Sequence, residues 1–187
     1  MPTHLALLRG INVGGHNRVA MADLRRVAAS LGHADVATYI QSGNVVFTSR
    51  DADTGALARA LERAIAETLD VRPAVVVLSR EDLRQVVADN PFPEVADPKH
   101  LHAVFGDREP GPARVAEVRA AQDAATARGS PDEARIVGRT LFLHTPEGIG
   151  RSELAARLTR TPRGAREGAG TARNWATVTR LLKMVEA

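Results

Sequence analysis

The stretch V-A-T-Y-I-Q-S-G-N-V-V-F-T (Val36–Thr48) decides the fold of the first half of the chain. It contains two runs rich in β-branched and aromatic residues, Val36–Gln41 and Asn44–Thr48, which are typical of strands. Only Ser42 and Gly43 separate these runs, and a two-residue connection that contains glycine favours a hairpin. The stretch therefore predicts two antiparallel strands.

The segments on either side of this hairpin complete a regular pattern. Upstream, alternating apolar residues predict a strand over Thr3–Asn12, and a helical apolar face from Met21 to a stop at Gly32 predicts a helix. Downstream, apolar residues repeat every four positions from Leu57 to Leu69, which predicts a helix that Asp53 caps. The buried run Ala74–Leu78 follows as a strand. The order β-α-β-β-α-β predicts a ferredoxin-like unit.

The second half repeats part of this order. We expect a strand near His100–Phe105, a helix over Pro112–Arg128, a second hairpin over Arg135–His144 and two closing helices from Ser152 and Asn174. This order is β-α-β-β-α-α, a partial echo of the first half. The sequence thus predicts an α+β protein with a ferredoxin-like subdomain and trailing helix (1–90), a proline-rich linker (91–99) and an α+β subdomain ending in two helices (100–187).

Composition excludes several classes of protein. The chain has 187 residues, of which 44% are hydrophobic and 25% charged, as in a globular protein. Because there is no cysteine, disulfides, thiolate metal sites and a cysteine nucleophile are excluded. No apolar run approaches the roughly 20 residues of a membrane span, and the start M-P-T-H-L-A-L-L-R-G does not resemble a signal peptide. We expect a cytoplasmic protein without a membrane partner; its cofactor, oligomeric state and any enzymatic reaction leave no trace in the sequence.

Positive charge is concentrated at the two ends of the chain. Basic side chains outnumber acidic ones in residues 1–50 and 151–187, whereas acidic side chains predominate between them. Nearly all basic residues are arginine, since Lys99 and Lys183 are the only lysines. Arginine presents a fork of N–H donors that matches phosphate and carboxylate.

Three glycine-rich segments each lead into an expected helix and suggest an anion site. They are Gly14–Asn17, Gly148–Ser152 and Gly168–Asn174. Helix N-termini expose unpaired N–H groups, and glycine lets an anion approach the backbone closely. The simplest functional hypothesis is a site for a phosphate- or carboxylate-bearing small molecule where the two ends of the chain meet. Its candidate residues are Arg9, Asn12, Gly14, Gly15, Asn17, Ser42, Asn44, Gly150, Arg151, Ser152, Arg173 and Asn174.

Other interpretations of the same residues remain open. Glycine beside Asn, Ser or Thr is also ordinary cap and turn chemistry, which would leave an interaction or structural module without a ligand. The arginine-rich segment Arg157–Arg173 is compatible with non-specific nucleic-acid binding, although the chain lacks an aromatic cluster for base stacking. His100 and His102 share one strand face and could hold a metal, but no third ligand has a convincing spacing, so we predict no metal site.

Four motifs resemble a bacterial family known as domain of unknown function 1697. They are L-L-R-G-I-N-V-G-G-H-N (Leu7–Asn17), T-Y-I-Q-S-G-N-V-V-F (Thr38–Phe47), G-I-G-R-S (Gly148–Ser152) and T-A-R-N-W-A-T-V (Thr171–Val178). The resemblance implies two small subdomains related to the ferredoxin-like arrangement and supplies no activity. His16, Glu153 and Ala176 depart from the residues common in that family, which changes the charge expected at the site. The family's marked positions carry over as Arg9, Gly10, Asn12, Gly14, Gly15, Asn17, Gln41, Ser42, Gly43, Asn44, Gly148, Gly150, Ser152, Thr171, Arg173, Asn174, Trp175 and Thr177.

Overall fold

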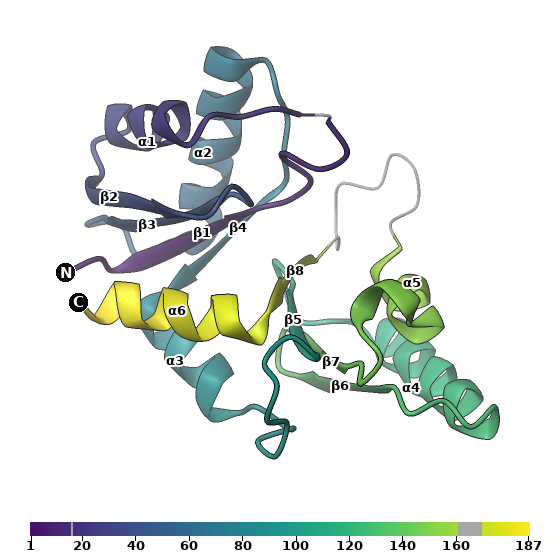
Figure 1. The fold of residues 1–187 in the computed structure, drawn as a ribbon. Helices are drawn as coiled ribbons and strands as arrows, with labels where there is room; N and C mark the ends of the chain where they lie inside the picture. The colour runs from purple at the N-terminus through teal and green to yellow at the C-terminus, as the bar shows by residue number, and fades with distance from the viewer. Residues whose placement is uncertain (16, 161–169) are drawn as a thin grey trace. The chain divides into compact units, whose positions relative to one another are not determined.

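The computed structural model describes residues 1–15, 17–160 and 170–187 (Figure 1). The chain divides into two compact units, which are described separately below. Unit 1 comprises Met1–Gln85 together with Arg180–Ala187, and unit 2 comprises Val86–Thr179. No helix in the described part of the chain is both long and apolar enough to span a membrane.

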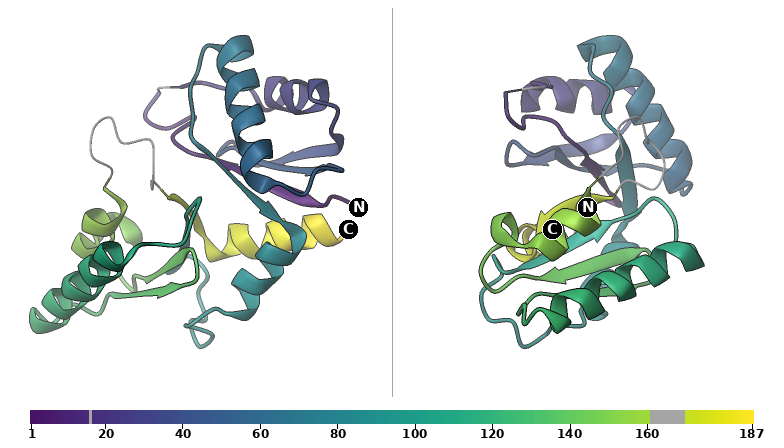
Figure 2. Two further views of the ribbon diagram at one scale, coloured as in Figure 1. Left: turned by 180° about the vertical axis from the view of Figure 1, so that it is seen from behind. Right: turned by 90° about the vertical axis from the view of Figure 1, so that its right-hand side faces the viewer.

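Unit 1 is a four-stranded antiparallel sheet covered by two helices. Its strands are β1 (His4–Leu8), β2 (Ala34–Tyr39), β3 (Asn44–Thr48) and β4 (Val75–Ser79), in the spatial order β2-β3-β1-β4. Helices α1 (Met21–Ser30) and α2 (Thr54–Leu69) connect β1 to β2 and β3 to β4, and both lie on the same face of the sheet (Figure 2). The predicted ferredoxin-like α+β fold is confirmed.

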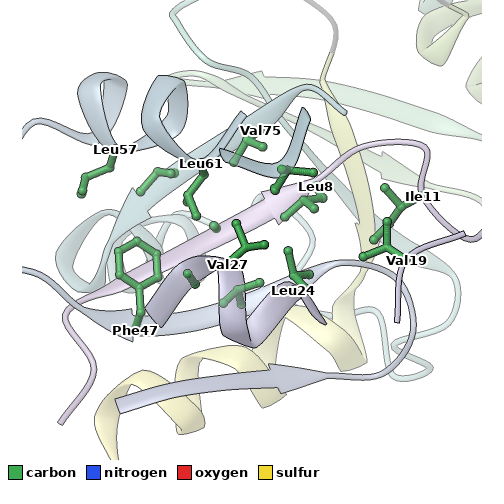
Figure 3. Packing of buried hydrophobic residues seen from close by; sticks show 14 of the residues in the cluster. Leu8, Ile11, Val19, Leu24, Val27, Phe47, Leu57, Leu61 and Val75 are labelled. Atoms are coloured by element: carbon green, nitrogen blue, oxygen red, sulfur yellow. The ribbon is translucent and has the colours of Figure 1, made fainter. Parts of the chain in front are cut away.

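The core of unit 1 lies between the sheet and its two helices (Figure 3). Because side chains alternate along a strand, one face of the sheet presents Leu8, Phe47 and Val75 to this core. Helix α1 contributes Leu24 and Val27 to this core, and α2 contributes Leu57, Leu61 and Ile65. The apolar side chains that repeat at helical spacing in the sequence therefore do face the core. Burying a side chain of this size contributes about 1.5–3 kcal/mol.

The opposite face of the same sheet is also buried. Leu5 and Leu7 of β1, Val46 of β3 and Leu78 of β4 point away from α1 and α2 and are at most 1% exposed. RNA-binding ferredoxin-like domains stack bases on an open sheet face. Unit 1 presents no such face among its described residues.

Unit 2 has the same sheet topology as unit 1. Strands β5 (Leu101–Phe105), β6 (Glu133–Val137), β7 (Thr140–His144) and β8 (Thr171–Asn174) have the order β6-β7-β5-β8. Helices α4 (Pro112–Ala127) and α5 (Glu153–Thr159) connect β5 to β6 and β7 to β8, with a short 3-10 helix, η1 (Ile149–Arg151), before α5. A further helix follows each sheet: α3 (Arg80–Ala88) after β4 and α6 (Trp175–Glu186) after β8.

The predicted order of unit 2 was therefore wrong in one element. The sequence predicted two consecutive terminal helices, whereas β8 lies between α5 and α6 and pairs with β5. This strand has only four residues, and its inward positions are occupied by Thr171 and Arg173 in place of apolar side chains. It therefore lacks the hydrophobic alternation that identifies a strand.

The boundaries between the units differ from those expected at positions 90 and 100. Helix α3 begins in unit 1 and ends in unit 2, while α6 begins in unit 2 and ends in unit 1. The proline-rich stretch 91–99 belongs to unit 2. Its Phe92 is fully buried, lies 5.6 Å from the ring of His144 and carries the guanidinium of Arg135 over its face at 4.6 Å. In unit 1, Arg84 of α3 pairs with Glu186 of α6 at 2.8 Å.

Candidate functional site

The loop between β1 and α1 contains five left-handed backbone positions among its described residues. They are occupied by glycine or asparagine, the residues that adopt this conformation at least cost: Gly10 (φ 67°), Asn12 (55°), Gly14 (58°), Gly15 (80°) and Asn17 (49°). The strand predicted over Thr3–Asn12 therefore ends earlier, at Leu8, and the following residues form the loop. His16 lies outside the described residues.

Asn12 holds this loop in place with its side-chain amide. Its Nδ2 donates to the carbonyl oxygens of Val19 at 2.9 Å and Gln41 at 2.8 Å, and its Oδ1 accepts from the Val19 N–H at 2.9 Å. Asn17 Nδ2 donates to the carbonyl of Gly10 at 3.0 Å. Both amides shape the loop that was predicted to bind an anion.

The turn between β2 and β3 packs against the same loop. It spans residues 40–43, not the predicted Ser42-Gly43 alone, since Tyr39 pairs with Asn44 across the ladder. Asn44 is fully buried, and its Nδ2 donates to the carbonyl of Tyr39 at 3.0 Å and to Ser42 Oγ at 2.9 Å. Ser42 and Asn44 therefore organise the turn next to the loop.

A hollow of about 620 Å³ opens beside the loop. Asn12, Gly15, Arg18 and Gln41 contribute to its lining, together with the residues that begin α1, Ala20 and Asp23. Arg18 is exposed, and the carboxylate of Asp23 pairs with Arg26 on the next turn of the helix. Arg9 is half-buried outside this lining, and burial lowers the pKa of its guanidinium.

Helix α1 begins without a side-chain cap, because Ala20 occupies its N-cap position. The other long helix of unit 1, α2, is capped as predicted: Asp53 Oδ1 accepts from the Ala56 N–H at 2.9 Å. Helix α3 has a reciprocal capping box, in which Ser79 Oγ accepts from the Asp82 N–H at 3.0 Å and Asp82 Oδ2 accepts from the Ser79 N–H at 2.9 Å. No described side chain caps the first-turn N–H groups of α1 in this way, and these groups lie beside the hollow.

The other predicted site residues lie in unit 2, where Ser152 makes a structural contact. Ser152 is 5% exposed, and its Oγ accepts from the Ala155 N–H at 2.9 Å, so it caps α5. Gly150 and Arg151 lie in η1 and are exposed. Arg151 lines a second hollow of about 360 Å³, together with Glu147, Glu153 and Arg128, and Glu153 lies 4.0 Å from Arg128.

Arg173 is a buried strand residue. It is 8% exposed, and its Nη1 donates to Thr171 Oγ1 and to the carbonyl of Ala172, both at 2.8 Å. Burial lowers the pKa of its guanidinium to about 10, so it is still charged at neutral pH. Asn174 Oδ1 accepts from the Thr177 N–H at 2.9 Å and caps the start of α6.

The predicted site residues thus form two groups, each within its own unit. Unit 1 brings together Asn12, Gly14, Gly15 and Asn17 of the loop with Ser42 and Asn44 of the turn. Unit 2 holds Gly150, Arg151, Ser152, Arg173 and Asn174. That the two groups meet at one site stays a prediction, as does a role for the arginine-rich segment, of which residues 161–169 lie outside the described part of the chain.

Sequence reasoning missed Ala20 as a site feature and had no signal for Asp23. The sequence does show that the residue immediately before Met21, the first residue of α1, is alanine and not one of the usual capping residues Ser, Thr, Asp or Asn. Within the described ranges, no three His, Asp or Glu side chains gather closely enough to hold a metal. His102 is 9% exposed, and its burial lowers the pKa of the imidazole.

These features define an α+β protein of two βαββαβ units, with a polar hollow at the loop that follows its first strand. The family model described as a protein of unknown function (DUF1697) matches residues 1–142, and the chain belongs to this family. The motifs noted at Gly148–Ser152 and Thr171–Val178 lie beyond that match.

Solved structures also match the chain, among them one that is similar over nearly its whole length. It is described as the conserved bacterial protein SP0830 from Streptococcus pneumoniae and shares 26% sequence identity at a TM-score of 0.72. The similarity covers 98% of this chain and 98% of that chain. No curated protein matches the sequence.

Proposed function

We propose that the protein binds a small molecule bearing a phosphate or carboxylate in the hollow beside the β1–α1 loop. The observation that carries this proposal is the uncapped start of α1 in a hollow lined by Gly15 and Arg18. Unpaired N–H groups and the partial positive charge of a helix N-terminus favour an anion there. Arg18 adds a forked, permanently charged donor at the rim.

Hydrogen bonds hold the described residues of the loop in a defined arrangement. Asn12 fastens it to Val19 and to Gln41, and Asn17 closes it on Gly10. These bonds reduce the ordering that the Asn12 and Asn17 segments would need on binding a ligand, which favours affinity. The carboxylate of Asp23, the acidic group in the lining, is already neutralised by Arg26.

The first test is a thermal-shift panel of nucleotides, sugar phosphates and small carboxylates at physiological salt. A ligand at a hundred times its Kd stabilises by about 2.7 kcal/mol. For a chain of this length, this corresponds to a rise in Tm of about 5–11 °C. Arg18→Ala is expected to remove most of the shift, while Arg63→Ala, an exposed arginine on α2, leaves it unchanged.

A second variant tests the helix terminus itself. Ala20 is exposed with an extended backbone (φ −71°, ψ 135°), so Ala20→Asp supplies an N-cap without strain. This cap is expected to stabilise the unliganded protein by about 0.5–2 kcal/mol and to abolish anion binding, because its carboxylate occupies the same N–H groups. A stabilised variant that binds the anion as tightly as the wild type contradicts the proposed site.

Two alternatives predict different results in the same panel. Non-specific nucleic-acid binding through the segment 157–173 predicts stabilisation by oligonucleotides alone, lost as salt is raised. An interaction module without a ligand predicts no shift with any compound. The buried faces of the sheet in unit 1 disfavour recognition by base stacking there.

A further inference from the structure

Unit 2 contains a cavity of about 390 Å³ that the anion hypothesis does not use. It lies within unit 2, between the loop from β5 to α4 and the hairpin of β6 and β7. Its volume falls in the range of about 300–1,000 Å³ that is usual for small-molecule sites. Its lining combines an apolar floor with a charged rim.

The floor is formed by three aliphatic side chains of the sheet. Val104 of β5, Ile136 of β6 and Leu141 of β7 line the cavity and also belong to the apolar cluster of unit 2. Ile136 and Leu141 are directly paired across the hairpin. A ligand that covers this floor gains the usual benefit of removing apolar surface from water.

The rim carries three arginines and two carboxylates. Arg114 and Arg139 are half-buried, whereas Asp107 and Glu109 are exposed. Arg114 is held in a fixed orientation because it pairs with Glu117 at 2.6 Å and donates to the carbonyl of Leu158. Because Arg114 and Arg139 are more buried than the two acids, the cavity favours a ligand with an anionic end.

Two glycines let the walls approach each other closely. The Gly106 N–H donates to the carbonyl of Arg139 at 3.1 Å, and a Cβ at Gly106 would lie only 3.0 Å from that oxygen. A Cβ at Gly170 would lie 2.5 Å from Val104 Cγ1. Close packing at these two glycines therefore helps to shape the cavity.

The cavity occupies the same place in unit 2 as the hollow in unit 1. Both lie where the loop after the first strand meets the turn of the central hairpin, because the two sheets share one strand order. The chemistry differs, since the unit 1 hollow is lined by glycine and amides and lacks an aliphatic floor of this size. The two sites are expected to take different ligands.

We infer that this cavity is a binding site for a small amphipathic anion, a molecule with an aliphatic body and a carboxylate or related acid at one end. The body would cover Val104, Ile136 and Leu141, and the acid would meet Arg139 and Arg114. This site does not depend on the anion site of unit 1, and either can fail without the other.

Octanoate is a suitable probe, with octan-1-ol as the uncharged match of equal chain length. In ¹H–¹⁵N NMR titrations of the full chain, octanoate is expected to shift the amides of residues 104–109, 111 and 136–141 saturably, with a Kd below about 1 mM. Octan-1-ol is expected to shift the same amides, with an affinity for the cavity at least fivefold lower than that of octanoate. Amides of Gly15 and Arg18 report separately on the unit 1 hollow.

Two variants and one control complete the test. Arg139→Gln keeps the backbone carbonyl that accepts the Gly106 N–H. It is expected to weaken the binding of octanoate at least fivefold and to have little effect on the binding of octan-1-ol. Ile136→Trp fills the apolar floor of the cavity and is expected to weaken the binding of both probes. The control is Arg119→Gln, at an exposed arginine of α4, which is expected to leave the affinity for both probes unchanged. The site is overturned if octanoate gives no saturable shifts in these segments, or if both folded variants bind it as the wild type does.

Discussion

Asn12 Nδ2 donates to the carbonyl oxygen of Gln41 at 2.8 Å and so ties the loop after β1 to the turn between β2 and β3. Unit 2 makes the corresponding connection by backbone, from the Gly106 N–H to the carbonyl of Arg139 at 3.1 Å. In both units the loop after the first strand is thus fixed to the central hairpin. The hollow and the cavity lie at these two junctions.

The first prediction concerns Asn12. Asn12→Ala removes three hydrogen bonds and places alanine at φ 55°, so it should lower the free energy of unfolding by about 2–4 kcal/mol. Urea unfolding followed by circular dichroism measures this loss. Asn12→Gly removes the same bonds without the backbone strain, so it should cost less than alanine. Equal stability of Asn12→Ala and wild type would show that the amide does not hold the loop.

Gly43 gives a second prediction with a matched control. A Cβ there would lie 2.7 Å from Leu8 Cβ and 2.8 Å from Ile11 Cδ1, and φ is 74°. Gly43→Ala should therefore cost about 2–5 kcal/mol, the sum of left-handed strain and overpacking. Gly138 also has a positive φ, of 55°, but has open space around it, so Gly138→Ala should cost only about 1–2 kcal/mol. Similar losses for both variants would contradict the crowding at Gly43.

The sequence predicts an element of this fold where the element has a regular pattern of apolar residues or a recognisable cap, and it fails where that pattern is missing. The two helices of unit 1, the cap at Asp53 and the presence of a hairpin before Asn44 follow from apolar periodicity and local turn chemistry and were predicted correctly, although the turn of the hairpin is longer than expected. Strand β8 was missed because Arg173 occupies an inward position that normally carries an apolar residue. A buried arginine is tolerated there through bonds to Thr171 and Ala172, which only the folded sheet provides.

The candidate site was predictable in its residues but not in their roles. Glycine and asparagine before a helix signal either a cap or a ligand loop, and one sequence cannot separate the two. The structure assigns Ser152 and Asn174 to capping and Asn12 to holding the loop. The hollow depends on Gln41 lying beside Asn12, and the cavity on Arg139 lying beside Gly106. These are tertiary contacts between distant segments, which periodicity and spacing do not encode.

A third prediction tests the cap at Ser152. Its Oγ accepts from the Ala155 N–H at 2.9 Å while nearly fully buried, so Ser152→Ala should cost about 1–2 kcal/mol in urea unfolding. Ser152→Asp retains an acceptor at the N-terminus of α5 and should recover part of the loss. If octanoate binding in unit 2 is unaffected by either change, Ser152 acts only on stability, as its geometry indicates.

The last prediction concerns pH and the ring stack around Phe47. His33 lies 4.5 Å from the Phe47 ring and His4 lies 5.6 Å from it, measured between ring centroids. His33 Nε2 is buried and has no hydrogen-bond partner among the described residues. Burial lowers the pKa of both imidazoles below the ordinary value of 6.5, and repulsion by His33 lowers that of His4 further. The folded protein therefore favours the neutral form of both rings.

The sign of the pH effect follows from proton binding. Below pH 6.5 the unfolded chain takes up protons on His4 and His33 that the folded chain does not, so stability is full above that pH and falls as the pH drops toward the folded pKa values. Urea unfolding at pH 7.5 and 5.5 should show a lower free energy of unfolding at pH 5.5. His33→Phe keeps a ring against Phe47 but cannot titrate, so it should reduce this difference while the protein stays folded at both pH values. An unchanged difference in that variant would place the pH dependence elsewhere, for example on His102, whose pKa burial also lowers.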